Sequence, residues 1–565
     1  MRGALRYLFS SLIVGVLSVG LAWAGSGLVP VGAQDPTQSI TGQDSTGDHD
    51  DDDDHDDDDD DETPQAPVQV LPGQNPPPGS VLAGASKISI EPRPGDYGGT
   101  WETDRAKCAT LSEDIVDQLP GSGAHLASAG SPWPENPNCI YMGGYGIGPM
   151  NPITSIDETG FWVRSAAVRG PNGKTLVTTI IDGEGYFWDY KNKCSDCGIK
   201  QLSSSIAGEL GIDPAGIVIA STHSHTSPDF IGGWGFVPDW YMKQVSDAIR
   251  KSITEAVTSM RLAVLETGEE LARGFNSERR STYRSAEEQE LTWLRAVAVN
   301  AGSGQPHPSQ PETVFTIGAY AAHPVTRDAD NGVGHADWPG LFERTVEQRF
   351  GGVGLLFMTG LGNISPRHPL PAYEGEGSEF MGRDLAGLIP GVGGGMTLQK
   401  TEVGVARTTW SHPVTNVPLT ALGAPGFFDR RFLEMPAEIR TGKDPNKAQC
   451  VSASAMSVEL PVSAARIGNA FAISAAPGEI FSNVSNTIKE KSGAIVTMPV
   501  GQAGDALGYM PQSFEMSQVA QQGLGFADPI KGYVLVNYED SYAIDKCVGD
   551  AVLEKTISLF SQIGF

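Results

Sequence analysis

Short apolar runs alternate with segments of helical spacing along most of this chain. The runs that predict strands cover 174–184, 215–226, 291–300, 313–325 and 352–366. The segments that predict helices cover 201–212, 238–260 and 338–351. Because strands and helices alternate, the pattern predicts the fold class α/β, with mixed β-sheets layered with helices in one large domain.

Polar residues repeatedly follow these apolar runs. One run ends in His223 and His225, and another ends in His323 directly before a proline. Two later runs lead to Glu479 after Pro-Gly and to Tyr509 after a glycine-rich loop. Side chains at positions i and i+2 of a strand share a face, so the two imidazoles of His-Ser-His are expected on one side. Strand ends are also where open α/β sheets place a ligand crevice.

These strand ends carry the donor types of a zinc site. Histidine and carboxylate are usual zinc ligands, and a catalytic zinc site keeps one position open for water. Tyrosine is an uncommon ligand, and the sequence has no compact HExxH motif. The same residues also fit structural roles, as core histidines, a carboxylate at a helix start and a buried phenol. The residue chemistry therefore leaves both interpretations open.

The N-terminus has the pattern of an export signal. A short basic start precedes an apolar run at 7–23, and small-residue cleavage sites follow. The run is nearly long enough to span a membrane, so an uncleaved anchor stays open. We predict a signal peptide at 1–33 and a secreted or cell-surface protein. Residues 34–85 are acidic and then Pro-rich, which predicts a disordered linker before a domain at 86–565.

The formal net charge is −29, and one run supplies 13 of the negative charges. This run, Asp48–Glu62, holds twelve Asp and one Glu beside His49 and His55. Such a block repels itself and favours a solvated spacer, although it could also bind Ca²⁺ or Zn²⁺ loosely. The acidity argues against nucleic acid as a partner.

Six cysteines occur in a chain with an export pattern, which favours disulfides. Cys194 and Cys197 form a lone CxxC, so a small loop disulfide is favoured over a four-thiolate zinc site. Cys108–Cys139 and Cys450–Cys547 are candidate pairs, although the sequence leaves the connectivity open.

The order of several motifs resembles that of the neutral (non-lysosomal) ceramidase family. The motifs are YMGGYG, GFWVRSAAV, STHSHTSPD, AAHPV, GLGNISP, PGEIFSN and GYM…NYE, and they span roughly residues 88–565. The resemblance implies a catalytic domain that uses Zn²⁺ to hydrolyse the amide of ceramide. By the motif match, His223, His323, Glu479 and Tyr509 would be the zinc ligands.

The resemblance also implies catalytic and substrate-binding residues. His225 matches a substrate-site histidine and is the candidate for proton transfer to the leaving amine, since imidazole titrates near neutral pH. Tyr538 matches a tyrosine that contributes to the site. Ser365 matches a serine considered functional, although it could equally be a capping turn residue. The family's arginine segment aligns poorly here, and GFNSERRSTY offers Arg279 or Arg280 for substrate binding.

Three features depart from the family pattern. Asn363 stands where the family has Asp, and an additional segment, GLGFADPIKGYVLV, follows Tyr509 before Asn537. Many members also carry a C-terminal β-sandwich domain, which we expect to be absent from this chain. These departures bear on the mouth of the pocket and on membrane docking.

Together with these residues, the family resemblance implies a secreted zinc-dependent amidohydrolase that cleaves the N-acyl bond of ceramide or a similar lipid amide to a fatty acid and an amine. A lipid substrate also allows peripheral contact with a membrane. Two alternatives stay open: an exported zinc hydrolase for another acyl amide or ester, and an inactive surface binding protein with the same fold. The aromatic stretch at 232–242 could line a slot for acyl chains or belong to an ordinary core.

Overall fold

The computed structural model describes twelve segments of the chain. These are residues 75–108, 136–145, 148–191, 193–280, 287–299, 305–307, 310–329, 331–367, 377–416, 429–434, 456–516 and 538–565. The predicted signal peptide, the Asp-rich run and Cys450 lie outside the described residues.

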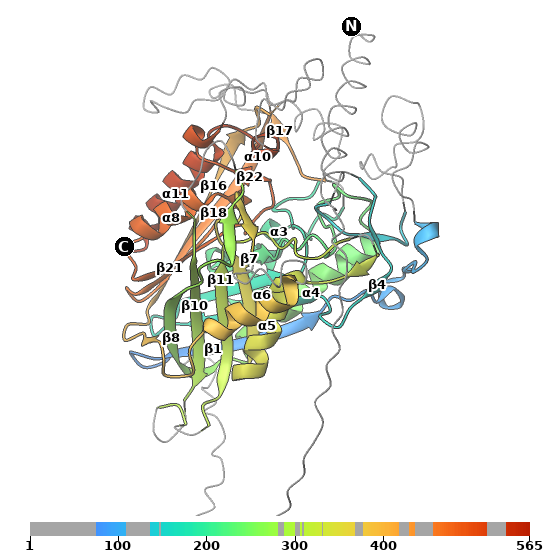
Figure 1. Cartoon of the computed structure of the whole chain (residues 1–565). Helices are drawn as coiled ribbons and strands as arrows, with labels where there is room; N and C mark the ends of the chain where they lie inside the picture. The colour runs from blue at the N-terminus through green and yellow to red at the C-terminus, as the bar shows by residue number, and fades with distance from the viewer. Residues whose placement is uncertain are drawn as a thin grey trace, which may run out of the picture.

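A nine-stranded mixed sheet forms one half of the centre (Figure 1). Its strands are β1 (Val81–Ser89), β5 (Trp162–Arg169), β6 (Thr175–Ile181), β7 (Ile217–Ser221), β8 (Arg261–Leu271), β10 (Glu290–Ala298), β11 (Thr313–Tyr320), β13 (Val353–Met358) and β15 (Met396–Thr397). The order is β13-β11-β10-β8-β1-β5-β6-β7, with β15 paired to β8. The pairs β6–β7 and β11–β13 are parallel, and the other pairs are antiparallel.

A five-stranded sheet forms the other half. Its strands are β16 (Val403–Pro413), β17 (Leu433–Glu434), β18 (Met456–Ile467), β19 (Phe471–Ala475) and β21 (Val496–Val500). The order is β16-β18-β19-β21, with β17 paired to β18, and the pair β19–β21 is parallel.

Four two-stranded pieces join the loops around these sheets. They pair β2 (Ile140–Tyr141) with β3 (Pro152–Ile153), β4 (Ser155–Ile156) with β12 (Val333–Gly334), β9 (Asn276–Glu278) with β14 (Ile364–Pro366), and β20 (Glu479–Ile480) with β22 (Tyr509–Met510). Short 3₁₀ helices are η1 (Pro94–Tyr97), η2 (Arg105–Lys107), η3 (Pro214–Gly216) and η5 (Ser513–Glu515).

Helices cover the outer faces of both sheets. The α-helices are α3 (Ile199–Leu210), α4 (Asp239–Thr258), α5 (Asp337–Phe350), α6 (Gly377–Leu388), α8 (Ser482–Lys491), α10 (Tyr538–Tyr542) and α11 (Val548–Gln562). Helix α4 packs on β1 and β5, and α5 packs on β13. Helices α8 and α11 pack on the five-stranded sheet (Figure 1). The predicted fold class is confirmed: the chain forms mixed sheets layered with helices in one large domain.

Successive side chains of a central strand enter two different apolar cores, which explains why the strand sequences are continuous apolar runs. In β6, Val177 and Ile181 belong to the core on the helix side, whereas Leu176 and Ile180 belong to the core between the sheets. A strand buried on both faces has no polar side, so its sequence shows no alternation.

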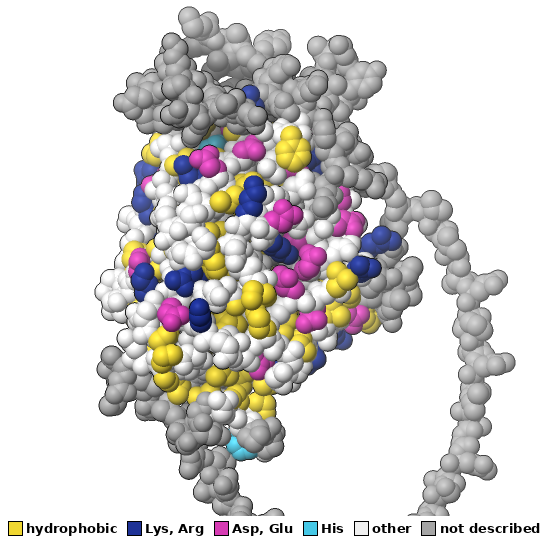
Figure 2. Space-filling view, turned by 90° about the vertical axis from the view of Figure 1, so that its left-hand side faces the viewer, with side chains coloured by type: hydrophobic (Ala, Val, Ile, Leu, Met, Phe, Trp, Pro, Cys, Tyr) yellow, Lys and Arg dark blue, Asp and Glu magenta, His cyan; other side chains and the backbone are white. Residues whose placement is uncertain are grey.

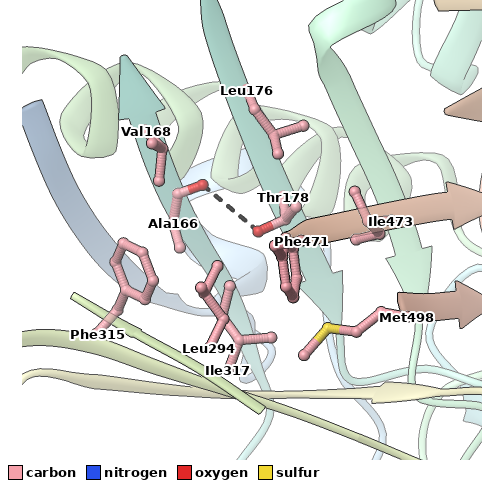
Figure 3. A pocket seen from close by; sticks show the side chains of 10 residues that line it. All are labelled: Ala166, Val168, Leu176, Thr178, Leu294, Phe315, Ile317, Phe471, Ile473 and Met498. Carbon is pink, nitrogen blue, oxygen red and sulfur yellow. Dashed lines mark hydrogen bonds between the residues drawn. The ribbon is translucent and has the colours of Figure 1, made fainter. Parts of the chain in front are cut away.

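The core between the sheets leaves a small apolar cavity (Figure 3). Side chains of β5, β6, β10 and β11 meet Phe471, Ile473 and Met498 from the five-stranded sheet. The cavity volume is ≈ 10 Å³, about that of one water probe. The space between the sheets is therefore core, and a substrate must bind elsewhere.

The predicted boundary between linker and domain cuts a strand. β1 begins at Val81, five residues before the predicted start at 86, and pairs with β5 and β8 inside the large sheet. The small residues of its sequence, VLAGASKIS, obscured the apolar pattern. One of them, Gly84, packs against the backbone of α4, where a Cβ atom would lie 2.1 Å from the Ala256 carbonyl oxygen.

The predicted disulfides are present where the structure describes both cysteines. Cys108–Cys139 and Cys194–Cys197 are formed. Cys547 is also disulfide-bonded, whereas its predicted partner Cys450 is outside the described residues.

Charged side chains of both signs are interspersed on the face drawn in Figure 2, and hydrophobic side chains form small groups there. Within the described residues, no helix combines the length and the apolar character needed to cross a membrane.

Candidate active site

Segments that follow strands of both sheets meet in one place. His223 follows β7 and His323 follows β11 of the large sheet, whereas Glu479 and Tyr509 come after β19 and β21 of the smaller sheet. Glu479 and Tyr509 are register partners in the parallel pair β20–β22. The ring centroids of His223 and His323 are 5.3 Å apart, and those of His323 and Tyr509 are 6.1 Å apart.

Backbone carbonyls orient the rings of His223 and His323. The Nδ1 atom of His223 lies 2.7 Å from the Glu184 carbonyl oxygen, and the Nδ1 atom of His323 lies 3.2 Å from the Ile364 carbonyl oxygen. A carbonyl can only accept, so in the neutral form each Nδ1 carries the proton and each Nε2 keeps its lone pair. The two Nε2 atoms lie 3.5 Å and 3.0 Å from the same oxygen, Oε2 of Glu479. Two imidazoles thus present lone pairs around one carboxylate.

The first histidine does not lie on a strand. β7 ends at Ser221, and His223 has a φ angle of +61°, in the left-handed region that residues other than glycine seldom adopt. Its backbone N–H donates to the Gly183 carbonyl at 2.9 Å, which holds this conformation. The expectation that His223 and His225 share one face of a strand is therefore wrong, because the chain leaves the strand at Ser221. Their ring centroids still lie 5.0 Å apart.

His225 completes a cluster of three imidazoles. Its backbone N–H donates to the Pro324 carbonyl at 3.2 Å, so the HSH and HP motifs are joined by a hydrogen bond. Its ring packs edge-on against Tyr145, with a centroid distance of 5.2 Å. Both ring nitrogens are buried and have no hydrogen-bond partner among the described residues. Buried imidazole nitrogens are normally paired, so this ring is poised for a ligand.

Gly144 leaves the space that His225 occupies. It has a φ of +88°, and a Cβ atom there would lie 2.3 Å from Cγ and Nδ1 of His225. We expect Gly144→Ala to lower the free energy of unfolding by about 1–3 kcal/mol through backbone strain. If the chain hydrolyses the lipid amide that its motif order implies, displacing His225 should lower the rate by roughly 100-fold. Denaturant unfolding and an amide-hydrolysis assay measure the two effects.

The matched control for this change is Gly208→Ala, in α3, where nothing lies within 4 Å of the added Cβ. If Gly144→Ala hydrolysed the amide substrate as fast as the Gly208→Ala protein, the role expected for His225 from the motif match would be wrong.

The two candidate arginines have different surroundings. Arg279 donates from Nη2 to the Tyr509 phenol oxygen at 2.9 Å and to the Gly362 carbonyl at 3.0 Å, and from Nε to Glu539 at 2.8 Å. Its positive charge stabilises negative charge on the phenol oxygen, which suits a metal-binding or oxyanion-stabilising tyrosine. Arg279 is thus part of the site.

The contacts of Arg280 are those of a residue that stabilises the fold. It donates to the Glu515 carbonyl at 2.6 Å, lies 3.5 Å from Asp540, and stacks over the ring of Phe481. Its side chain is 1% exposed, against 24% for Arg279. The contacts of Arg280 tie η5 to α10.

This difference predicts opposite outcomes for two matched variants. Arg280→Gln should destabilise the protein by about 3–5 kcal/mol, because it removes a buried positive charge that lies 3.5 Å from the buried carboxylate of Asp540. Arg279→Gln should cost less stability, because its side chain is partly exposed, but it should reduce the hydrolysis that the motif order implies by releasing Tyr509. Denaturant unfolding and steady-state kinetics on both proteins test this pair. Equal loss of stability in the two would contradict the assignment.

The remaining predicted residues lie beside this cluster. Ser365 pairs in register with Ser277 in β14–β9 and directly follows Ile364, whose carbonyl holds His323. The backbone of Tyr538 begins α10, next to Glu539, although its side chain is outside the described atoms. Roles for Ser365 and Tyr538 stay predictions.

Asn363 joins the GLGNISP motif to α8. It accepts from the Ser482 backbone N–H at 2.8 Å and donates to the Ser482 hydroxyl at 3.0 Å. Its own carbonyl accepts from the Arg279 N–H at 3.0 Å. An aspartate could also accept from the Ser482 backbone N–H, and it could accept from the Ser482 hydroxyl. This explains how Asn and Asp can both occupy position 363.

Sequence reasoning missed Glu184. It lies just beyond β6, and its carboxyl Oε1 is 3.5 Å from Nδ1 of His223. Burial raises the pKa of this carboxyl to about 8. Glu184 also follows an apolar run, in the segment IIDGEG, as His223 does. The position after a strand could therefore have identified Glu184 from the sequence.

Electrostatics divide the imidazoles into two kinds. Burial by itself lowers the pKa of His223, but attraction to Glu479 outweighs it and raises the pKa to about 9. Burial and the charge of Arg279 lower the pKa of His323 to about 4. Burial and the neighbouring histidines hold the pKa of His225 well below its usual value. His225 and His323 are therefore neutral at pH 7, with lone pairs to offer.

Burial would raise the pKa of Glu479, but His223 and His323 hold it well below its usual range.

The donor set fits a metal ion. His223, His225 and His323 each offer one ligand atom, and these atoms all lie within 4.8 Å of one another. Glu479 adds a carboxylate oxygen between two of the rings. Imidazole and carboxylate donors in this number suit Zn²⁺, and the unpaired nitrogens of His225 are the kind of atom that a ligand satisfies.

The aromatic stretch at 232–242 contributes mainly to the core. Trp240 and Tyr241 are buried against other core side chains, and the Tyr241 hydroxyl donates to the Ile90 carbonyl. Trp234 is only partly buried. The core interpretation therefore holds for the helical end of this stretch.

Comparison with solved structures finds the same arrangement of elements in ceramidases. One is the crystal structure of neutral ceramidase from Pseudomonas aeruginosa, with a TM-score of 0.53, 14% sequence identity, and coverage of 85% of this chain and 74% of that chain. A second, described as a ceramidase complexed with C2, has a TM-score of 0.54 with the same identity and coverage. The chain shares the fold of these ceramidases. No family model matches the sequence, and no curated protein matches it.

Proposed function

We propose that this protein is an exported zinc-dependent amidohydrolase that cleaves the N-acyl bond of ceramide or a similar lipid amide. The observation that carries the proposal is the convergence of two Nε2 atoms, from His223 and His323, on one oxygen of Glu479. The fold shared with solved ceramidases supports the choice of substrate class. The apolar N-terminal segment supports export.

Four side chains would hold the metal in this proposal: His223, His323, Glu479 and Tyr509. When bound, Zn²⁺ supplies a Lewis acid that polarises the scissile carbonyl and lowers the pKa of water. The carbonyls of Glu184 and Ile364 keep the two imidazoles in the tautomer that such binding needs.

His225 would move the proton. It is neutral because of its depressed pKa, and its ring nitrogens have no other partner among the described residues. It accepts a proton as water adds to the amide carbon, and it returns that proton to nitrogen as the C–N bond breaks. One water is consumed, and a carboxylic acid and an amine leave. For ceramide these products are a fatty acid and a sphingoid base.

Arg279 would hold Tyr509 in place as a metal ligand and stabilise negative charge on its phenol oxygen. The guanidinium fixes the phenol at 2.9 Å and places a positive charge beside it. Tyr538 and Ser365 are proposed to complete the site from α10 and β14.

A panel of substrates tests the proposal. The full chain is purified, its bound zinc is measured, and release of the amine is followed with ceramides, other N-acyl amines and esters. The proposal predicts turnover of ceramides and its loss in His223→Ala. Zinc with faster turnover of another acyl amide or ester would assign the second kind of hydrolase. Zinc binding without any turnover would leave a binding protein and reject the enzyme.

A further inference from the structure

We infer that Glu184 is a positioning residue that holds His223 in its metal-binding orientation. The inference rests on the proposed metal centre and deepens it. Glu184 follows β6, and His223 follows β7, the parallel neighbour of β6. The two segments continue side by side, with the His223 N–H bonded to the Gly183 carbonyl. This pairing sets Glu184 directly against the imidazole.

Glu184 contacts the imidazole with two separate groups. Its carbonyl oxygen lies 2.7 Å from Nδ1 of His223, and its carboxyl Oε1 lies 3.5 Å from the same atom. The carbonyl fixes the tautomer with Nε2 free. In its ionised form the carboxyl places negative charge behind the ring, and a cation at Nε2 favours that form; the charge in turn strengthens Nε2 as a donor.

The burial of this carboxyl has no other explanation in its surroundings. Glu184 is 3% exposed, and its Oε2 atom has no hydrogen-bond partner among the described residues. By contrast, the buried Glu343 lies 2.7 Å from the guanidinium of Arg164. A buried carboxyl is costly unless it is paired, and the ion-pair contact of Glu184 is with His223 at 3.5 Å, so its position is best accounted for by what it does to that imidazole.

The YMGGYG motif makes room for this arrangement. A Cβ atom at Gly143 would lie 2.4 Å from Cβ and 2.5 Å from Cγ of Glu184. The next residue, Gly144, leaves the space for His225 in the same way. Gly143 therefore offers a second way to move the carboxyl without removing its charge.

Zinc affinity of the full chain tests the inference, measured by competition with a chromophoric chelator. Glu184→Gln keeps the size and the backbone carbonyl, and we expect it to bind Zn²⁺ about 10- to 100-fold more weakly than the wild type. Gly143→Ala should weaken binding in the same direction. The controls are Glu266→Gln, a buried carboxylate bonded to the Gly393 N–H in the large sheet, and Gly208→Ala. Both controls should bind zinc like the wild type.

The melting temperature of the metal-free protein separates positioning from folding. We expect Glu184→Gln to leave it unchanged or raise it, because a buried carboxyl is removed. Unchanged zinc affinity in Glu184→Gln, with tight binding by the wild type, would overturn the inference alone. A melting temperature that falls in the metal-free variant along with affinity would assign a structural role and also overturn it. A wild type without saturable zinc binding would overturn both this inference and the proposed function.

Discussion

Glu479→Gln is expected to weaken zinc binding by more than about 100-fold and to reduce ceramide hydrolysis to background. Oε2 of Glu479 is the point on which the Nε2 atoms of His223 and His323 converge, at 3.5 Å and 3.0 Å. Glutamine keeps the shape of the side chain but replaces an anionic donor with a neutral amide. Substitution of a group that only contacts a metal-binding side chain already lowers metal affinity about 10- to 100-fold. Loss of the metal-binding carboxylate itself should lower it more. Chelator competition and the ceramide assay measure the two losses.

Glu266→Gln is the matched control for this substitution, since its carboxylate is buried in the large sheet and bonds to Gly393. It should keep both zinc and turnover. A Glu479→Gln protein that retained stoichiometric zinc would show that the ion binds elsewhere, and the assignment of the centre would fail.

Removal of the metal should abolish hydrolysis and lower the melting temperature together. A ligand that binds only the folded state stabilises it by about 2.7 kcal/mol at a concentration 100 times its Kd. The ligands come from segments that follow strands of both sheets, so the ion would tie the two halves of the site. The measurement is a thermal melt and a ceramide assay after chelation, and again after Zn²⁺ is restored.

The double variant His223→Ala/His323→Ala provides the control for chelation, because it should show no zinc-dependent change in melting temperature. Full activity after exhaustive chelation of the wild type would rule out a metal-dependent reaction.

Much of the site could be predicted because polar residues in buried strands are rare and strand ends gather at sheet edges. The runs before His223 and His323 are strands, and these residues do meet. The geometry within HSH could not be predicted from strand periodicity, because the left-handed φ of His223 depends on the hydrogen bond to Gly183. Local sequence does not encode that bond.

The choice between Arg279 and Arg280 shows a second limit. The two residues follow β9, and consecutive side chains in extended backbone point in opposite directions. Which of them faces Tyr509 depends on where β14 and α10 lie, and those segments are distant in sequence. The start of β1 was missed for a related reason, since its small residues are selected by contact with α4.

The departure at Asn363 leaves the local arrangement intact. Its side-chain bonds to Ser482 and its carbonyl bond to Arg279 link the end of the large sheet to α8 and to the site. Asn363 is fully buried. Its side-chain amide therefore has a structural role, connecting the end of the large sheet to α8.

Anomalous diffraction from crystals of the zinc-loaded full chain is the most direct measurement of the proposed centre. The account predicts one zinc peak about 2.0–2.2 Å from Nε2 of His223, Nε2 of His323 and a carboxylate oxygen of Glu479. A fully loaded protein with no peak among these three atoms would contradict it.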